Sequence, residues 1–227
     1  MTRIALTLAL AAYNNLANAW PPFNRAAYVP ANLLLTAAVA LVAFGPLGLT
    51  FEEVVGELAA LDALLGAALG ALLTAPLFIA SRWPRWRARI ADQRSAHLSG
   101  GRLVYRCLVG VPIGTALTEE WAFRGVTFAA WAQTESTFAA ALISSAAFGL
   151  WHIAPARHAL LANRPQSTRA ALVRHVSLTV VVTTLAGLGL VALRIADAGL
   201  LLPLAVHATV NSLATLAAVR AGRKIES

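Results

Sequence analysis

Charged side chains are scarce in this chain of 227 residues. Only 12% of its residues are Asp, Glu, Lys or Arg and 59% are hydrophobic, whereas charged residues make up about 25% of a typical soluble domain. Cysteine is rarer still, because Cys107 is the only one. A single cysteine excludes an intramolecular disulfide and a metal site built from several thiolates. The composition therefore argues against a soluble globular domain and against cysteine chemistry.

Long apolar runs take the place of the missing charges. A helix needs about 20 apolar residues to cross a bilayer. Runs of suitable length and composition occupy residues 2–20, 28–49, 58–80, 103–131, 137–153, 175–194 and 199–219. We therefore predict an all-α fold, a polytopic membrane helix bundle with six to seven transmembrane helices.

The first of these runs has two interpretations. Arg3, the apolar stretch 4–12 and the triplet Ala17-Asn18-Ala19 are compatible with a cleaved signal peptide. The same residues can instead form a first, somewhat polar span that ends before Pro21-Pro22, where proline breaks a helix. We favour the span, because a polytopic bacterial protein rarely needs a cleaved signal.

The basic residues are grouped along the chain, which carries a net charge of +8. They gather in residues 82–102, 157–174 and 220–224. Basic loops stay in the cytoplasm, so this pattern predicts an integral membrane protein with a cytoplasmic C-terminus. No nucleic-acid-binding motif accompanies them, and the bilayer is the partner we expect. The abundance of Arg and Ala further indicates a GC-rich bacterial genome, and hence the bacterial plasma membrane.

The organisation predicted along the chain is a single integrated domain. Residues 1–102 comprise N-terminal transmembrane helices, a short interfacial segment at 50–57 and a basic interfacial linker. Residues 103–219 form a helical core, and residues 220–227 form a basic cytoplasmic tail.

Polar side chains recur at a spacing of four residues inside the apolar runs of this core. Four residues bring two side chains to the same face of a helix. A charge in the middle of a membrane helix costs about 2.5–3.5 kcal/mol on insertion scales, so such residues usually mark function. The pairs are Glu120 with Arg124, Phe148 with His152, and His207 with Asn211, and Glu119 adjoins the first.

The helical spacing of Glu119, Glu120 and Arg124 suggests separate roles for the two carboxylates. Glu120 and Arg124 share a helix face and can form an ion pair that lowers the cost of burying both. Glu119 projects about 100° around the helix, so we expect it to face a cavity. Phe148 is then a packing residue that supports the site.

These groups suffice to hydrolyse an amide. A Glu–His pair can hold and deprotonate a water, and a second His with an Asn can stabilise a developing oxyanion. Glu119, His152 and His207 could alternatively bind a zinc ion, as two histidines and a carboxylate do in hydrolytic sites. The residues alone leave this choice open.

The three segments 119–124, 148–152 and 207–211 resemble the motifs EExxxR, FxxxH and HxxxN of the CPBP intramembrane proteases. This family includes type II CAAX prenyl endopeptidases and Abi-like bacteriocin-processing or immunity proteins, some called metalloproteases. The resemblance spans residues 103–219 and implies an intramembrane endopeptidase. It implies that Glu119 and His152 activate water and that His207 and Asn211 form the oxyanion hole. Because this glutamate mechanism needs no metal, we lean toward a site without a tightly bound metal. A protein or peptide substrate would then reach the site from the membrane or the cytoplasm.

Two other functions remain compatible with buried Glu and His. A transporter or proton-relay protein uses such residues along an ion path. An immunity or scaffold protein on the same fold would not catalyse a reaction. Transporters often carry an internal repeat, but the segment 103–131 has no charged counterpart in the other half of the chain. A scaffold could lose catalytic groups, yet all of them are present, so both features favour the protease.

Overall fold

The computed structural model describes residues 1–20 and 27–226, and these form helices joined by short connections. The pairing of Gly56 with Gly199 is an isolated bridge, and the described residues contain no strand. The elements in chain order are α1 Thr2–Ala17, α2 Tyr28–Phe44, α3 Phe51–Val55, α4 Ala60–Ala80, α5 Pro84–Ile90, the 3₁₀ turn η2 Gln93–Ser95, α6 Gly100–Tyr105, the π-helical segments η3 Arg106–Gly110, η4 Pro112–Leu117 and η5 Glu120–Thr127, α7 Phe128–Ala132, α8 Thr137–Trp151, α9 Ile153–Asn163, α10 Arg169–Asp197 and α11 Leu201–Glu226. The prediction of an all-α fold is confirmed.

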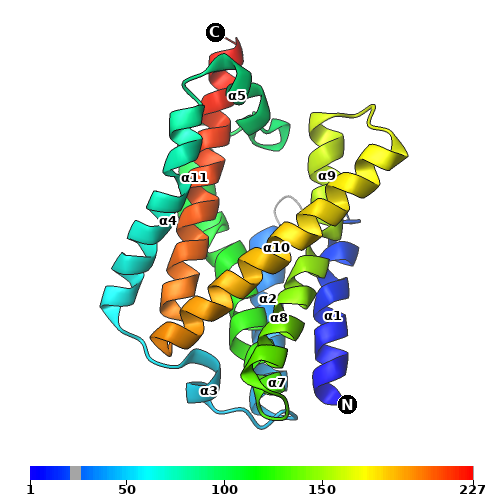
Figure 1. The fold of residues 1–227 in the computed structure, drawn as a ribbon, viewed down its shortest axis with the longest axis vertical. Coiled ribbons are helices and arrows are strands. Elements are labelled where there is room, and N and C mark those ends of the chain that lie inside the picture. The colour runs from blue at the N-terminus through cyan, green and yellow to red at the C-terminus, as the bar shows by residue number, and fades with distance from the viewer. Residues whose placement is uncertain (21–26, 227) are drawn as a thin grey trace.

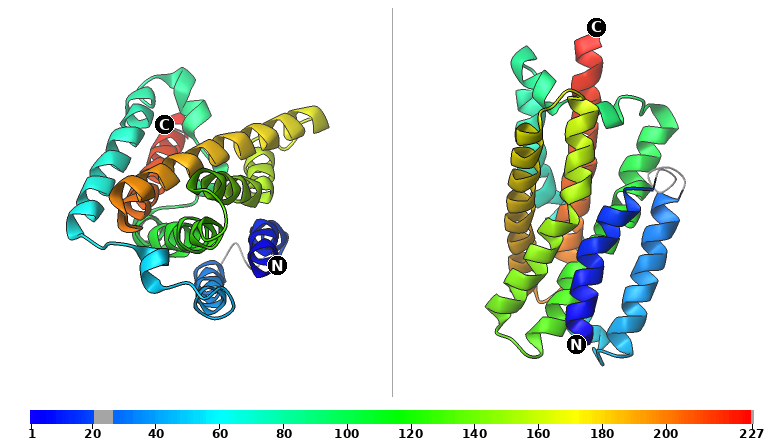
Figure 2. Two further views of the ribbon diagram at one scale, coloured as in Figure 1. Left: turned by 60° about the horizontal axis from the view of Figure 1, so that its bottom comes forward. Right: turned by 90° about the vertical axis from the view of Figure 1, so that its right-hand side faces the viewer.

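The helices form two groups that α10 joins (Figure 1). Helices α4 and α11 run side by side, and α1, α2 and α8 form the other group. Helix α10 crosses between them at a steep angle, as the left view of Figure 2 also shows. The segments η4 and η5 pack against α2, α3, α8 and α11, so the core predicted to carry the chemistry lies at the centre.

Within the described ranges, four helical stretches are long and apolar enough to cross a membrane, fewer than the six to seven predicted. They are Ala60–Ala80, Thr137–Asn163, Arg169–Asp197 and Leu201–Ile225. The other predicted spans are helical but shorter or divided. Helix α2 has 17 residues and α1 has 16, and the run 103–131 is divided among α6, three π-helical segments and α7.

Helices extend into two basic segments that we placed outside the spans. The expected basic loop 154–174 contains α9, and α10 begins at Arg169 because the Thr168 hydroxyl accepts the backbone N–H of Ala171. The basic tail expected at 220–227 continues α11 as far as Glu226. Charge marks where a chain leaves the membrane, whereas a helix continues until a cap or a breaker ends it.

The basic groups lie together at one end of the molecule. Helix α5, the connection between α9 and α10, and the C-terminal end of α11 all lie at the top of Figure 1. The N-terminus and α3, which carries Glu52 and Glu53, lie at the opposite end. This separation matches the distribution of charge expected from the sequence.

Gly66 and Gly70 allow α4 to pack very closely on α11. A Cβ atom at Gly66 would lie 2.6 Å from the Cβ of Ala205, and one at Gly70 would lie 2.7 Å from the Cβ of Thr209. Small residues four apart permit such approach between membrane helices. This contact fixes the part of α11 that carries His207.

Arg194 binds α10 to α3, at the end of the molecule that carries Glu52 and Glu53. Its guanidinium donates to the carbonyl oxygens of Glu53 and Val55, at 2.7 and 3.3 Å. These carbonyls end a short helix, where they lack partners within the helix. Leu200 adds a backbone hydrogen bond of 2.9 Å to Val55. Arg194 therefore acts on the backbone of another helix.

Candidate active site

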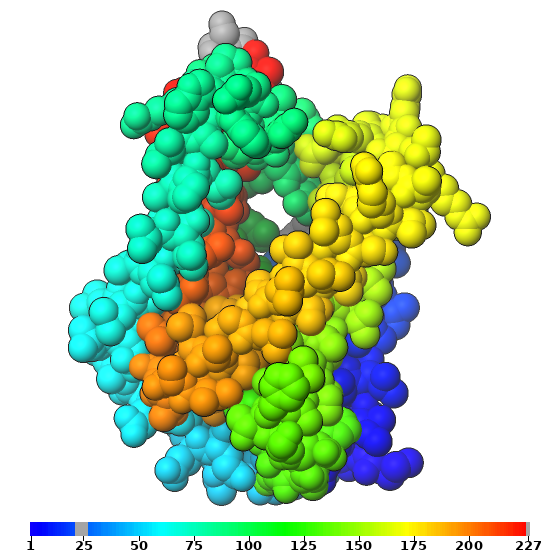
Figure 3. Space-filling view, in the orientation of Figure 1, coloured from blue at the N-terminus to red at the C-terminus, as the bar shows by residue number. Residues whose placement is uncertain are grey.

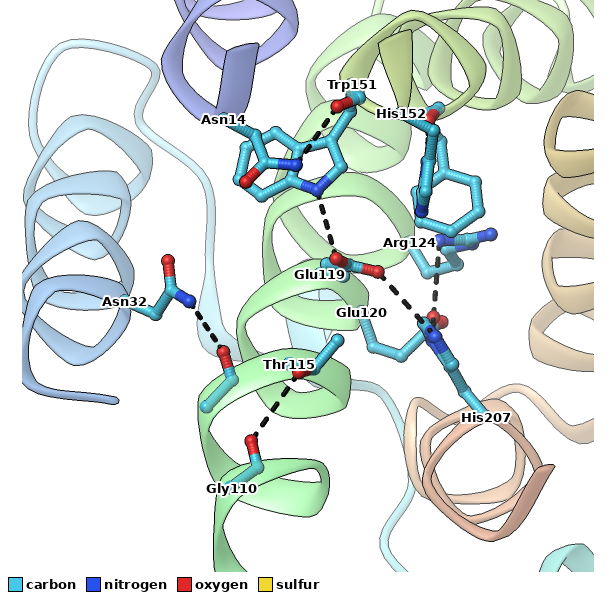
Figure 4. Close-up of polar contacts among 12 residues, drawn as sticks. Asn14, Asn32, Gly110, Thr115, Glu119, Glu120, Arg124, Trp151, His152 and His207 are labelled. Atoms are coloured by element: carbon cyan, nitrogen blue, oxygen red, sulfur yellow. Dashed lines mark hydrogen bonds and ion pairs between the residues drawn. The ribbon is translucent and has the colours of Figure 1, made fainter. Parts of the chain in front are cut away.

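The segment that carries both glutamates winds in wide, π-helical turns. Backbone N–H groups of Val111 and Ala116 donate five residues back, to Arg106 and Val111, at 2.9 and 2.8 Å. The Thr115 hydroxyl likewise donates to Gly110 (Figure 4). Such turns are rare and are frequent at functional sites. They alter the directions of Glu119 and Glu120 from those of a regular helix.

Glu120 is fully buried and binds two partners. Its Oε1 lies 3.2 Å from Nη1 of Arg124, which is also fully buried, so the predicted ion pair is present. The same oxygen lies 2.6 Å from Nδ1 of His207. An ionised carboxylate only accepts hydrogen bonds, so Nδ1 of His207 is the donor. Glu120 therefore orients a histidine as well as pairing with Arg124.

Glu119 is 5% exposed, and its two carboxylate oxygens have different surroundings. Its Oε1 accepts the indole N–H of Trp151 at 3.0 Å. Its Oε2 lies 3.6 Å from Nε2 of His207 and has no hydrogen-bond partner among the described residues. Residues 119 and 207 thus meet although they are far apart in the sequence. One carboxylate oxygen is held in place and the other remains available.

His152 lies at the C-terminal end of α8, where the chain turns into α9. Its Nδ1 is 2.7 Å from the carbonyl oxygen of Phe148, one turn earlier. A carbonyl can only accept, so Nδ1 carries the hydrogen and, in the neutral ring, Nε2 keeps its lone pair. The four-residue spacing of Phe148 and His152 therefore sets the tautomer of the histidine as well as its direction.

The ring of Phe148 packs among the charged groups. The guanidinium carbon of Arg124 lies 4.0 Å from its centroid. The rings of His152 and His207 meet it edge to face, at centroid distances of 4.7 and 6.0 Å. Helix α10 closes over this cluster at Gly187, where an added Cβ would lie 3.3 Å from both Arg124 and Phe148. Phe148 thus separates the two imidazoles and supports Arg124.

Asn211 is half-buried on α11, one turn after His207. Its amide has no hydrogen-bond partner in residues 1–20 and 27–226; the bond at this residue joins its backbone carbonyl to the Thr215 hydroxyl. The structure thus brings Glu119, Glu120, Arg124 and His207 into direct contact. It places Phe148 and His152 beside them, and Asn211 follows His207 by one turn of α11.

The side chains as arranged do not fit a metal ion. No three His, Cys, Asp or Glu residues within the described ranges come close enough together to ligate one. Of the proposed set Glu119, His152 and His207, the structure records contact between Glu119 and His207, and Nδ1 of His207 is engaged by Glu120.

Trp151 is a site residue that the sequence reasoning missed. It is 2% exposed, stacks on Tyr13 of α1 and meets Phe123 edge to face. Its indole N–H reaches Glu119, as Figure 4 shows. A Trp directly before the motif histidine, in a helix of small residues, is the signal that could have found it.

The region that carries these residues matches a known protein family. The model of the Rce1-like type II CAAX prenyl endopeptidases matches residues 101–213. The chain belongs to this family. The Rce1-like region begins within α6 and contains Glu119, His152, His207 and Asn211. No curated protein and no solved structure shows a significant match to the chain.

Proposed function

We propose that this Rce1-like protein is an intramembrane endopeptidase that hydrolyses a peptide bond with water activated by Glu119. The observation that carries the proposal is the difference between the two oxygens of this carboxylate. Trp151 holds Oε1, whereas the buried Oε2 faces His207 without a hydrogen bond. A positioned carboxylate with an available oxygen in a site shielded from bulk water is suited to act as a general base.

The proposed reaction begins with a water bound between Glu119 and His152. Oε2 of Glu119 takes one proton from the water, and Nε2 of His152 accepts a hydrogen bond from the other. The water oxygen bonds to the scissile carbonyl carbon, whose oxygen becomes an oxyanion. The C–N bond then breaks as the amide nitrogen takes the proton held by Glu119. This sequence leaves a carboxylic acid and an amine and returns the carboxylate to its ionised form.

His207 and Asn211 are the proposed donors to the oxyanion. Glu120 holds Nδ1 of His207 at 2.6 Å, which points Nε2 toward Glu119. The Asn211 amide lies one turn farther along α11 and has no partner to give up. Removal of one such donor typically lowers kcat about 10²–10³-fold.

The proposed membrane arrangement has six to seven spans, so that α1, α2 and the segment 100–132 also lie within the bilayer. The basic end would face the cytoplasm of a bacterium, with the C-terminus inside. Figure 3 shows a hollow between α10 and α11 below the basic end of the molecule. A peptide substrate could enter there from the membrane or the cytoplasm.

Comparative proteomics of membranes tests the function and identifies substrates together. Cells containing wild-type protein should accumulate cleaved fragments that are missing from cells containing Glu119→Gln protein at the same level. Glu52→Gln is the matched control, because Glu52 is an exposed carboxylate of α3. The same fragments in all three samples would exclude Glu119 as the base. Metal analysis of the purified active protein decides separately whether zinc takes part.

A further inference from the structure

Two asparagines of α1 bind the backbone at the junction of α8 and α9, on either side of His152. Nδ2 of Asn14 donates to the carbonyl of Trp151 at 3.0 Å. Nδ2 of Asn15 donates to the carbonyl of Leu150 at 2.8 Å, and its Oδ1 accepts the backbone N–H of Ala154 at 2.7 Å. These groups lie at a helix end, where backbone donors and acceptors lack helical partners.

Asn14 is itself held in the orientation that this contact needs. Its side chain is buried, and its Oδ1 accepts the amide of Asn18 at 2.8 Å. With Oδ1 occupied, the NH₂ group of Asn14 points at Trp151. An unsatisfied polar group in the membrane costs several kcal/mol, so these amides strongly favour one geometry of the junction.

The residues at this junction are the ones on which the proposed chemistry depends. Trp151 places its indole N–H on Glu119, and His152 turns its ring toward Phe148 and Arg124 (Figure 4). Tyr13 stacks on Trp151 with centroids 5.7 Å apart, which adds a third contact from α1. Helix α1 lies outside the region 101–213 that matches the family.

We propose that Asn14 and Asn15 are positioning residues for catalysis, which hold Trp151 and His152 in place against Glu119. This inference rests on the proposed function. It assigns to α1 a role in the reaction rather than in membrane anchoring alone. A shift of about 1 Å in a catalytic group can reduce the rate about 100-fold.

The test compares Asn15→Ala and Asn14→Asp proteins with the wild type in detergent. Asn14→Asp keeps the size of the side chain but loses the donor to Trp151. Thr183→Val is the matched control, because the Thr183 hydroxyl binds only carbonyls of its own helix. We expect kcat to fall about 10- to 100-fold in both asparagine variants, with KM and the folded fraction close to the wild type. Thr183→Val should keep the wild-type kcat.

Hydrogen exchange provides a second readout that does not require activity. Backbone amides of residues 149–156 should exchange faster in both asparagine variants and at the wild-type rate in Thr183→Val. Normal kcat in a folded Asn15→Ala protein, or unchanged exchange in 149–156, would overturn the inference. If exchange rises as expected but the wild-type protein cleaves no peptide bond, the two asparagines still hold the α8–α9 junction in place, and the proposed function fails. If Asn15→Ala does not fold, Asn14→Asp decides alone.

Discussion

His207 is bound by Glu120 through Nδ1 at 2.6 Å while its Nε2 lies 3.6 Å from Glu119. One imidazole therefore bridges the two adjacent carboxylates. Arg124 pairs with Glu120 in turn, at 3.2 Å, so the four side chains form one closely coupled cluster.

Replacing Glu120 with Ala should mainly destabilise the protein. Arg124 would remain fully buried without its carboxylate, and breaking a buried pair in this way costs about 3–5 kcal/mol. Unfolding in detergent, monitored by circular dichroism, measures the loss. Glu52→Ala should leave stability unchanged, because this side chain is exposed. A Glu120→Ala protein as stable as the wild type would contradict the role of the pair.

Replacing Glu119 with Gln should abolish activity and preserve the fold. The amide oxygen of Gln can still accept the indole N–H of Trp151, whereas an amide cannot take a proton from water. We expect kcat to fall about 10²–10⁴-fold, the range that general base catalysis contributes. Steady-state cleavage of a substrate peptide, with a parallel melting curve, provides the measurement. Wild-type turnover would rule out Glu119 as the base.

Replacing Trp151 with Phe removes the donor to Glu119 and keeps most of the ring. The loss of one buried hydrogen bond to a charged group is about 1.5–3 kcal/mol, so we expect kcat to fall at least tenfold with little change in KM. Trp121→Phe is the control, because the indole N–H of Trp121 is buried and has no hydrogen-bond partner in the part of the chain that the structure describes. Equal kcat values for the two variants would show that the contact with Glu119 is not used.

Replacing Gly70 with Ala should weaken the packing of α4 on α11. The new Cβ would lie 2.7 Å from Thr209 and 2.9 Å from the carbonyl oxygen of Val206. Overpacking of this kind costs about 1–3 kcal/mol, and we expect a lower melting temperature and reduced activity as His207 shifts. Gly189→Ala meets nothing within 4 Å and should be neutral or slightly stabilising. Equal melting temperatures would show that α11 adjusts freely.

The contact between η2 and α9 should loosen in acid. Burial alone would raise the pKa of Asp92, but hydrogen bonds and charge from Arg94, together with Asn163, lower it below its ordinary value. A lowered pKa means that the stabilisation is present above the unfolded pKa and is lost as pH falls through the folded value. Amides 92–96 should then exchange faster relative to the rest of the chain. The Asp92→Asn protein should lack this pH dependence.

Much of the fold could be predicted because the apolar runs impose helices. Composition cannot say where a helix ends, so α9 and the extension of α11 were missed. The pairing of Glu120 with Arg124 follows from local spacing and was predicted. The contact of Glu120 with His207 was missed, because it depends on how α11 packs and on the wide turns of the 106–127 segment. The roles of Asn14 and Asn15 lie in contacts between distant helices, which no local pattern reveals.

The wide turns make the length of the 106–127 segment a determinant of chemistry. Each of them accommodates a residue that a regular helix would have no room for. Deletion of that extra residue would restore a regular helix and leave the residues on either side in register. Deletion of a residue from a regular turn before Glu119 would instead rotate both carboxylates by about 100°, away from α11. The direction of the acids therefore tolerates a change of length only at the wide turns.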